Sequence, residues 1–320
     1  MSLLAVEDLS VRFTTPDGIV PAVERVSLAI EPGERIGIVG ESGSGKSQLF
    51  LALLGLLARN GRATGRALFA GRDLLALPNA ALNAIRGSDI AMVFQNPMSC
   101  LNPYLTIGTQ LAEVLTTHKG ASEAEARRRA AAMLARIGIA EPERRLAAYP
   151  HEFSGGMRQR VMIAMALLCD PKLIIADEPT TALDVTIQAQ ILDLFRGLEA
   201  TSQAALVLIS HDLGVVAGLC DRVLVMYAGR IVEEAPVEAL FADPRHPYTR
   251  GLLASLPDRQ ATPRQALPAI AGQPPEPLAR PPGCAFADRC PHVMPRCRAA
   301  LPPLFGPPGR RAACFLEEAA

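Results

Sequence analysis

A chain of 320 residues is long enough for one large domain and a smaller appendage, because domains commonly span about 100 to 200 residues. Apolar residues make up 49% and charged residues 20% of it, a composition typical of globular proteins that excludes a mainly disordered chain. Basic and acidic residues number 32 each, and this balance argues against nucleic acid as a partner.

The apolar segments are too short for a membrane-spanning helix. The longest, residues 49–58, has ten residues and contains a glycine, whereas a bilayer requires about 20. Residues 1–8 lack a basic start followed by an apolar stretch, so we expect no secretory signal and a reducing, cytoplasmic environment. There the cysteines are expected to be thiols or ligands, and Cys100, Cys169 and Cys220 to be small buried apolar side chains.

Strand patterns dominate the beginning of the chain. Residues 3–13 and 22–30 are predicted strands separated by a Pro-Asp-Gly turn, and residues 35–39 form a short β-branched run. A helix is predicted over residues 46–59, closed by an Asn-Gly pair. The order is therefore strand, glycine-rich loop, helix.

Another helix is predicted to begin at Ser122. Glu125 completes a capping-box pattern with it, and apolar residues follow at helical spacing. The basic triplet at 127–129 falls mostly off the apolar face, so we interpret it as a solvated surface rather than a phosphate site.

Apolar strands are predicted at residues 173–176 and 205–209. The helix predicted between them is marked by Ile187, Ile191, Leu194 or Phe195, and Leu198. Strands buried on both faces that alternate with helices are typical of a parallel α/β sheet. Residues 223–227 and 230–233, joined by an Ala-Gly turn, are predicted to form a hairpin at the edge of this sheet.

The sequence Gly-Glu-Ser-Gly-Ser-Gly-Lys-Ser at 40–47 has the spacing of a P-loop, between a predicted strand and a predicted helix as that motif requires. Backbone N–H groups of such a loop form a nest for phosphates. Lys46 is expected to reach the β- and γ-phosphates, and the Ser47 hydroxyl to bind Mg²⁺. The alternative is a Gly/Ser turn that only caps a helix. The predicted nucleotide-binding positions of the loop are Gly40, Ser42, Gly43, Gly45, Lys46 and Ser47.

Two carboxylates follow the apolar strand at 173–176, at the end where ligands bind in open α/β sheets. Asp177 is expected to hold Mg²⁺ through water, and Glu178 to polarise the attacking water as general base. An isolated Asp-Glu pair is also common in solvated turns. Combined with the P-loop, it indicates a nucleoside triphosphatase.

The sequence Phe-Ser-Gly-Gly-Met-Arg-Gln at 153–159 resembles the signature loop of the ABC ATPase family, with Ser154 lying 23 residues before Asp177 as in that family. Physically it is a second Ser/Gly anion cradle that leads into a helix. The resemblance implies that Ser154, Gly155 and Gly156 contact a γ-phosphate presented by another subunit.

Further motifs resemble that family in the same order. Gln95, in Phe-Gln-Asn-Pro, resembles the Q-loop residue that touches the Mg²⁺ and water network, and Asp184, in Ala-Leu-Asp, resembles the D-loop. His211 resembles the switch histidine that contacts the γ-phosphate, although a lone histidine after a strand is often structural. Phe13 stands where the family stacks an aromatic ring, more commonly tyrosine, on adenine.

The resemblance to ABC ATPases covers residues 3 to about 235. Beyond it, residues 246–253 resemble the C-terminal extension of dipeptide, oligopeptide and nickel import ATPases. The segment around the signature loop, with Met157 directly after Ser-Gly-Gly, resembles one of the two paired ATPases of such permeases. This implies a heterodimer with a second ATPase, two transmembrane permease subunits, an extracytoplasmic substrate-binding protein, and a peripheral position on the cytoplasmic face of the bacterial cytoplasmic membrane. Import of nickel or another small solute is the alternative to peptide import.

The region from residue 257 onward holds 14 of the 27 prolines and shows little periodicity, so we expect a linker or a segment held by a staple. Its cysteines, separated by five, six and sixteen residues, are Cys284, Cys290, Cys297 and Cys314. Four thiolates fit zinc or an iron–sulfur cluster, and this spacing does not decide between them. Similarity to peptide-permease ATPases favours a 4Fe-4S cluster, with zinc or no metal as alternatives.

The expected fold is an α/β P-loop NTPase of ABC type with a parallel-sheet core. The resemblance adds an antiparallel β-subdomain and a helical subdomain at about 96–165. We predict a nucleotide-binding domain at 1–235 and the C-terminal extension at 236–320. A non-transport ABC ATPase is disfavoured because the chain has no coiled-coil insert or second cassette, and a binding-only cassette because Glu178, His211 and Ser154 are intact.

Overall fold

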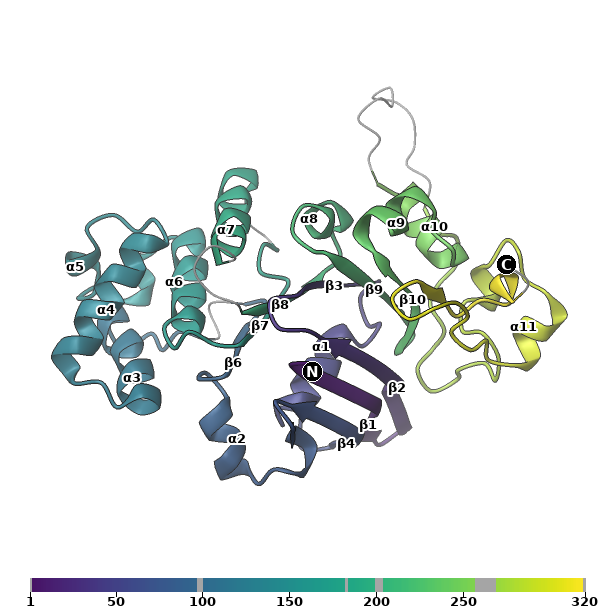
Figure 1. The fold of residues 1–320 in the computed structure, drawn as a ribbon, viewed down its shortest axis with the longest axis horizontal. Coiled ribbons are helices and arrows are strands. Elements are labelled where there is room, and N and C mark those ends of the chain that lie inside the picture. Colours follow the sequence, from purple (N-terminus) through teal and green to yellow (C-terminus); the bar gives the residue numbers. More distant parts are fainter. Residues whose placement is uncertain (1, 97–99, 182–183, 199–203, 257–268, 319–320) are drawn as a thin grey trace. The chain divides into compact units, whose positions relative to one another are not determined.

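The computed structural model describes residues 2–96, 100–181, 184–198, 204–256 and 269–318. They form two compact units (Figure 1). The first comprises Met1–Ile30, Arg35–Ala76 and Ile209–Ala320, and the second Glu31–Glu34 and Leu77–Leu208. The α/β class predicted from the sequence is confirmed, whereas the domain boundary predicted at 235/236 falls inside the first unit and stays a prediction.

An antiparallel sheet opens the first unit, and its strands lie in the order β2-β1-β4-β5. The strands are β1 (Leu4–Thr15), β2 (Gly18–Ile30), β4 (Gly61–Phe69) and β5 (Arg72–Asp73). Leu4 lies opposite Ile30 on one side and Phe69 on the other, and all three side chains are buried. These cross-strand apolar contacts fix the register of β1 in the middle of the sheet.

The other strands of this unit follow the order β11-β10-β9-β3. They are β3 (Arg35–Val39), β9 (Arg222–Tyr227), β10 (Arg230–Pro236) and β11 (Arg311–Ala312). β3 and β9 are parallel, and β9 and β10 form the predicted antiparallel hairpin. The prediction that this hairpin lies at the sheet edge was wrong, because β11 from the proline-rich tail pairs with the outer side of β10.

The helices of the first unit are α1 (Lys46–Leu53), α8 (Leu213–Ala217), α9 (Val237–Ala242), α10 (Pro247–Ala254) and α11 (Pro295–Ala299). α1 is six residues shorter than predicted. Gly55 has a left-handed φ of 60°, its N–H donates to Ala52, and the N–H of Leu56 donates to Leu51. This is a Schellman arrangement that ends the helix.

The second unit contains the strands predicted at 173–176 and 205–209, and beside them β6, which the sequence patterns did not predict, in the order β8-β7-β6. They are β6 (Ile90–Val93), β7 (Leu173–Asp177) and β8 (Ala205–Ser210). Its helices are α2 (Asn79–Ile85), α3 (Ile107–Lys119), α4 (Glu123–Arg136), α5 (Pro142–Arg145), α6 (Gly155–Leu167) and α7 (Val185–Leu198). Across the described ranges, no helix combines the length and apolar character needed to cross a bilayer.

A separate apolar core holds α3, α4 and α6 together and includes Leu111, Leu134 and Val161. Ser122 caps α4 as predicted, since its hydroxyl oxygen accepts a hydrogen bond from the N–H of Glu125 at 3.3 Å.

The three isolated cysteines differ in burial. Cys169 and Cys220 are buried, as predicted, and burial raises the pKa of Cys220 to about 12. Cys100 is only half-buried, and its thiol donates to the Asn96 carbonyl, so the prediction of a buried side chain was wrong there.

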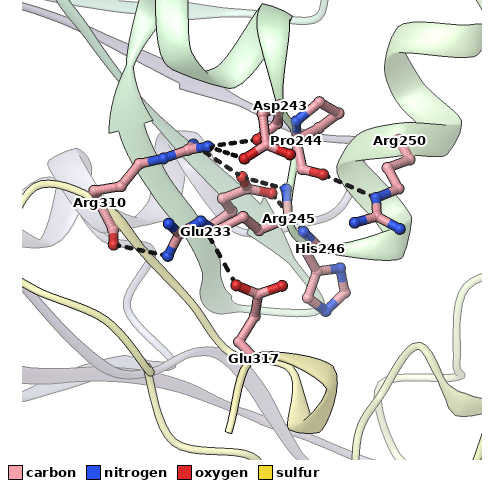
Figure 2. A network of polar contacts seen from close by, with 8 residues as sticks. All are labelled: Glu233, Asp243, Pro244, Arg245, His246, Arg250, Arg310 and Glu317. Atoms are coloured by element: carbon pink, nitrogen blue, oxygen red, sulfur yellow. Dashed lines mark hydrogen bonds and ion pairs between the residues drawn. The ribbon is translucent and has the colours of Figure 1, made fainter. Parts of the chain in front are cut away.

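The tail is anchored to β10 through a buried carboxylate (Figure 2). Glu233 is fully buried and accepts hydrogen bonds from the backbone N–H groups of Arg245 and His246, both at 2.8 Å. Arg310 approaches the same carboxylate at 3.8 Å and pairs with Asp243 at 3.0 Å. A buried charge is tolerated only when it is paired and hydrogen-bonded, so Glu233 ties three chain segments together.

His246 caps the N-terminus of α10 as an uncharged hydrogen-bond acceptor. Its Nδ1 accepts from the N–H of Tyr248 at 3.0 Å. Burial, together with the nearby charge of Arg250, lowers the pKa of His246 to about 3, so the ring carries no charge near neutral pH.

Replacing the Glu233 carboxylate tests this anchor. Glu233→Gln places an amide NH₂ against a backbone N–H and leaves Arg310 without its buried counter-charge, so the free energy of unfolding should fall by about 2–3 kcal/mol. Glu238→Gln, at an exposed position in the first turn of α9, is the matched control. Urea unfolding of both variants checks this, and equal midpoints would contradict the anchoring role.

Candidate functional site

The P-loop at 40–47 runs from β3 into α1 and is tightened by its own lysine. Lys46 is only 6% exposed, and its Nζ donates to the carbonyl oxygens of Gly40 at 2.7 Å and Glu41 at 3.0 Å. Gly45 caps α1 in the left-handed conformation. The loop therefore presents a cation and the N-terminus of a helix, both of which favour a bound phosphate.

Two glycines of the loop lie against neighbouring backbone. A Cβ on Gly40 would stand 2.1 Å from the Met226 carbonyl oxygen, and one on Gly45 would stand 2.3 Å from the Ala22 carbonyl oxygen. Both positions have positive φ, so glycine is required for conformation as well as for space. Gly43 also has positive φ, but a Cβ added there would point into open space, with nothing within 4 Å.

Phe13 and His211 belong to the same unit as the P-loop. Phe13 is half-buried in β1, opposite Val20 of β2 and Gly61 of β4. His211 is exposed immediately after β8. Their roles toward adenine and the γ-phosphate remain predictions.

The predicted catalytic carboxylate lies in the second unit, at the carboxyl end of β7. Asp177 is buried, and Glu178 follows it with a left-handed φ of 47°. The Oε2 atom of Glu178 accepts hydrogen bonds from Gln95 Nε2 and from Thr181 Oγ1, both at 2.9 Å. β6 and β7 are parallel neighbours, which brings Gln95 to Glu178 although 83 residues separate them.

The signature residues begin α6 at an exposed helix N-terminus. The Ser154 hydroxyl accepts from the N–H of Met157 at 3.3 Å, and Ser154 and Gly155 are exposed. Gly156 packs closely, since a Cβ there would lie 2.8 Å from Ile187. The arrangement leaves N–H groups of a capped helix open to an anion.

Gln159 joins the signature helix to the loop after Glu178. Its buried Nε2 donates to the Pro179 carbonyl at 2.7 Å. Asp184, also exposed, accepts from the N–H of Ile187 at 3.0 Å and starts α7, whereas Ala182 and Leu183 of the predicted D-loop lie outside the described residues.

The four tail cysteines converge. Cys284, Cys290, Cys297 and Cys314 all line one cavity of about 10 Å³. Burial raises the pKa of Cys284 to about 11 and also raises the pKa values of Cys290 and Cys314, with the neighbouring cysteines adding to the shift. These thiols are protonated near neutral pH, so a metal binding there must displace protons.

This donor set suits a thiophilic centre, because four cysteine thiolates are the ligands of structural zinc and of iron–sulfur clusters. Among the residues that the structure describes, however, no three His, Cys, Asp or Glu side chains are already arranged to hold a metal ion.

Comparisons with known proteins identify the family of the chain. The sequence profile of the ABC transporter family matches residues 23–181, and that of the oligopeptide/dipeptide transporter C-terminal region matches residues 232–297. The oligopeptide transport ATP-binding protein OppD of Salmonella typhimurium is 55% identical over 313 residues, which cover 98% of this chain and 93% of that protein. The chain belongs to the ABC transporter ATPases.

Another relative and a solved structure are also similar to this ABC ATPase. The dipeptide transport ATP-binding protein DppD of Bacillus subtilis is 50% identical over 94% of this chain and 90% of its own. A dimeric ATP-binding cassette, solved in a post-hydrolysis state with ADP and Pi, is 30% identical, with a TM-score of 0.66 over 73% of this chain and 98% of the cassette.

Three residues of the ABC ATPase went unnoticed as site residues in the sequence. Thr181 and Gln159 hold the loop around Glu178, and Glu41 lies inside the P-loop with partners described below. Thr181 lies three residues after Glu178, and Gln159 is the last residue of the motif at 153–159; these positions are the signal in the sequence that points to them.

Substitutions in the P-loop of the ABC ATPase separate steric contact from backbone strain. Gly45→Ala should abolish measurable nucleotide binding, because the new methyl meets the Ala22 carbonyl while φ is 96°. Gly43→Ala introduces strain of about 1–2 kcal/mol without a clash, so it should weaken binding far less. Titration with a fluorescent ATP analogue tests this pair, and equal losses would contradict the packing argument.

Proposed function

We propose that this ABC ATPase binds and hydrolyses ATP to power the import of oligopeptides or dipeptides through partner permease subunits. The main support for this proposal is that nearly the whole chain, including residues 232–297, is similar to ATP-binding proteins of oligopeptide and dipeptide transport. Membership in the ABC transporter ATPases supplies the ATP-hydrolysing activity itself.

The P-loop binds the triphosphate in this proposal. Lys46, whose Nζ contacts the Gly40 and Glu41 carbonyls, reaches the β- and γ-phosphates, and N–H groups at the start of α1 donate to the phosphate oxygens. Phe13 stacks on the adenine, and His211 contacts the γ-phosphate. Ser47, Gln95 and Asp177 supply oxygen ligands or water contacts for Mg²⁺, which neutralises charge on the phosphates when bound.

Glu178 is the general base. Its carboxylate accepts the proton of the attacking water, and the hydrogen bonds from Gln95 and Thr181 to Oε2 hold the carboxylate in one orientation. The left-handed backbone at Glu178 is strain of the kind found at active sites, and the buried Gln159 contact to Pro179 supports that turn.

A second ATPase subunit completes each site. The exposed Ser154 and Gly155, together with the partly buried Gly156, face a nucleotide bound by the partner, and Asp184 faces the partner's site. The dimeric state of the similar cassette with ADP and Pi supports this arrangement. We propose a heterodimer that lies under two transmembrane permeases on the cytoplasmic face of the membrane and works with an extracytoplasmic binding protein. Binding ATP more tightly in the closed pair than in the open pair shifts the pair toward closure.

The four-cysteine cavity is proposed to hold a 4Fe-4S cluster as a structural staple for the extension. The presence of all four cysteines around one cavity supports a metal centre, and zinc is the alternative.

Replacing the general base separates binding from turnover. Glu178→Gln removes the proton acceptor but keeps the shape of the side chain, so ATP hydrolysis in the assembled complex should fall about 100-fold or more while nucleotide binding persists. Glu143→Gln, on exposed α5, is the control. Wild-type turnover of Glu178→Gln would refute the assignment.

Elemental analysis decides the content of the cysteine cavity. Protein purified without oxygen should be brown and contain about four iron atoms and four acid-labile sulfides per chain, and Cys297→Ser should lose both. Cys220→Ser, which alters a buried cysteine in another part of the unit, is the control. Stoichiometric zinc without iron would favour the alternative, and absence of both would contradict a metal centre.

A further inference from the structure

The P-loop of this protein is held by its C-terminal extension through one residue, Glu41. The N–H of Glu41 donates to the Tyr248 hydroxyl oxygen at 2.8 Å. Its carboxylate accepts hydrogen bonds from both terminal nitrogens of Arg289, at 2.8 and 2.9 Å. These partners lie 207 and 248 residues further along the chain, and all three residues belong to the first compact unit.

Contacts other than the one with Glu41 hold the Arg289 side chain in place. Its side chain is 5% exposed. Nε donates to the Ala271 carbonyl at 3.0 Å, and Nη2 to the Ile270 carbonyl at 3.3 Å. Nη1 also donates to the Tyr227 hydroxyl at 3.2 Å, and the Tyr227 and Phe286 rings each lie 5.8 Å from the guanidinium carbon. A guanidinium with so many partners loses little further entropy when it pairs with a carboxylate.

Aromatic rings connect this ion pair to the four-cysteine cavity. The ring centroids of Tyr227 and Tyr248 lie 4.6 Å apart, and Phe286 lies 5.3 and 5.5 Å from them. Phe286 also lines the cavity of the cysteines, and Arg289 directly precedes Cys290. The segment that carries the cysteines is therefore the segment that delivers the guanidinium to the P-loop.

The negative charge of Glu41 makes its pairing with Arg289 relevant to phosphate binding at the P-loop. A P-loop accepts a polyanion, and a carboxylate in the loop opposes that binding, most strongly when it is partly removed from water. Glu41 is 27% exposed and follows Gly40 directly, and Lys46 donates to its carbonyl. Bidentate pairing with Arg289 cancels the charge and fixes the side chain at once.

We propose that Arg289 is a positioning residue for nucleotide binding, which neutralises and orients Glu41 so that the P-loop accepts the triphosphate. The inference rests on the proposed binding of ATP at the P-loop. It makes the extension a structural part of the nucleotide site and assigns a task to the cysteine segment beyond its own stability.

Three variants of the full chain test the proposal by equilibrium titration with Mg²⁺ and a fluorescent nonhydrolysable ATP analogue. Arg289→Met leaves the Glu41 charge uncompensated, so the Kd should rise on the order of tenfold. Glu41→Gln removes that charge, so the double variant Glu41→Gln/Arg289→Met should bind more tightly than Arg289→Met alone. A double-mutant cycle measures this recovery.

Further measurements exclude a purely structural role. The Arg289→Met defect should shrink as ionic strength rises, Arg289→Lys should restore part of the affinity, and kcat at saturating ATP should change much less than KM. Arg311→Met is the matched control, because Arg311 pairs with buried Glu234 and ties the tail to β10 without touching the P-loop. It should lower the melting temperature and leave the Kd unchanged.

The possible outcomes distinguish a failure of the role proposed for Arg289 from a failure of the proposed nucleotide site. Unchanged Kd in Arg289→Met, or a double variant no better than that single variant, would overturn the role of Arg289. A wild-type chain that binds no ATP analogue would instead overturn the proposed nucleotide site, and with it the inference.

Discussion

The contact between Lys46 and the carbonyls of Gly40 and Glu41 sets the shape on which the other parts of the nucleotide site depend. A buried ammonium needs acceptors, and the loop supplies them from its own backbone. The turn is therefore tight, and it lies close to β2 and β9, where Gly45 and Gly40 leave no room for a side chain. Strand β3, helix α1 and the neighbouring sheets all serve to keep this loop in one conformation.

Local patterns predicted those elements of the fold whose structure is local in origin. The apolar runs at β3, β7 and β8, the Ser122 cap of α4 and the P-loop each express their structure within a few residues. The predicted end of α1 lies six residues too far along the chain, because the composition of the segment does not reveal that Gly55 adopts a left-handed conformation, which stops the helix. β11 was missed because a two-residue strand has no periodicity and forms only by pairing with β10.

The candidate site also contains residues that short motifs predict and residues that depend on long-range contacts. Residue types and spacing predicted Lys46, Asp177 and Glu178, and the resemblance to the ABC family added Ser154, because their chemistry is contained in short motifs. Thr181, which shares the Glu178 carboxylate with Gln95, and Arg289, which pairs with Glu41, depend on contacts that arise only after folding. The extension had the composition of a linker, yet it contributes a strand, a buried ion-pair network and the partners of Glu41. Its low periodicity reflects anchoring by polar contacts and aromatic rings instead of a repeated apolar face.

The central claim is that two ATPase subunits share each nucleotide. A structure of the assembled transporter trapped with ATP and Mg²⁺ tests it most directly. The account predicts that the γ-phosphate contacts the Lys46 ammonium of this chain, and that the Ser154 hydroxyl of this chain contacts the nucleotide held by the second ATPase. A closed, nucleotide-bound complex in which the Ser154 turn lies far from both nucleotides would contradict it.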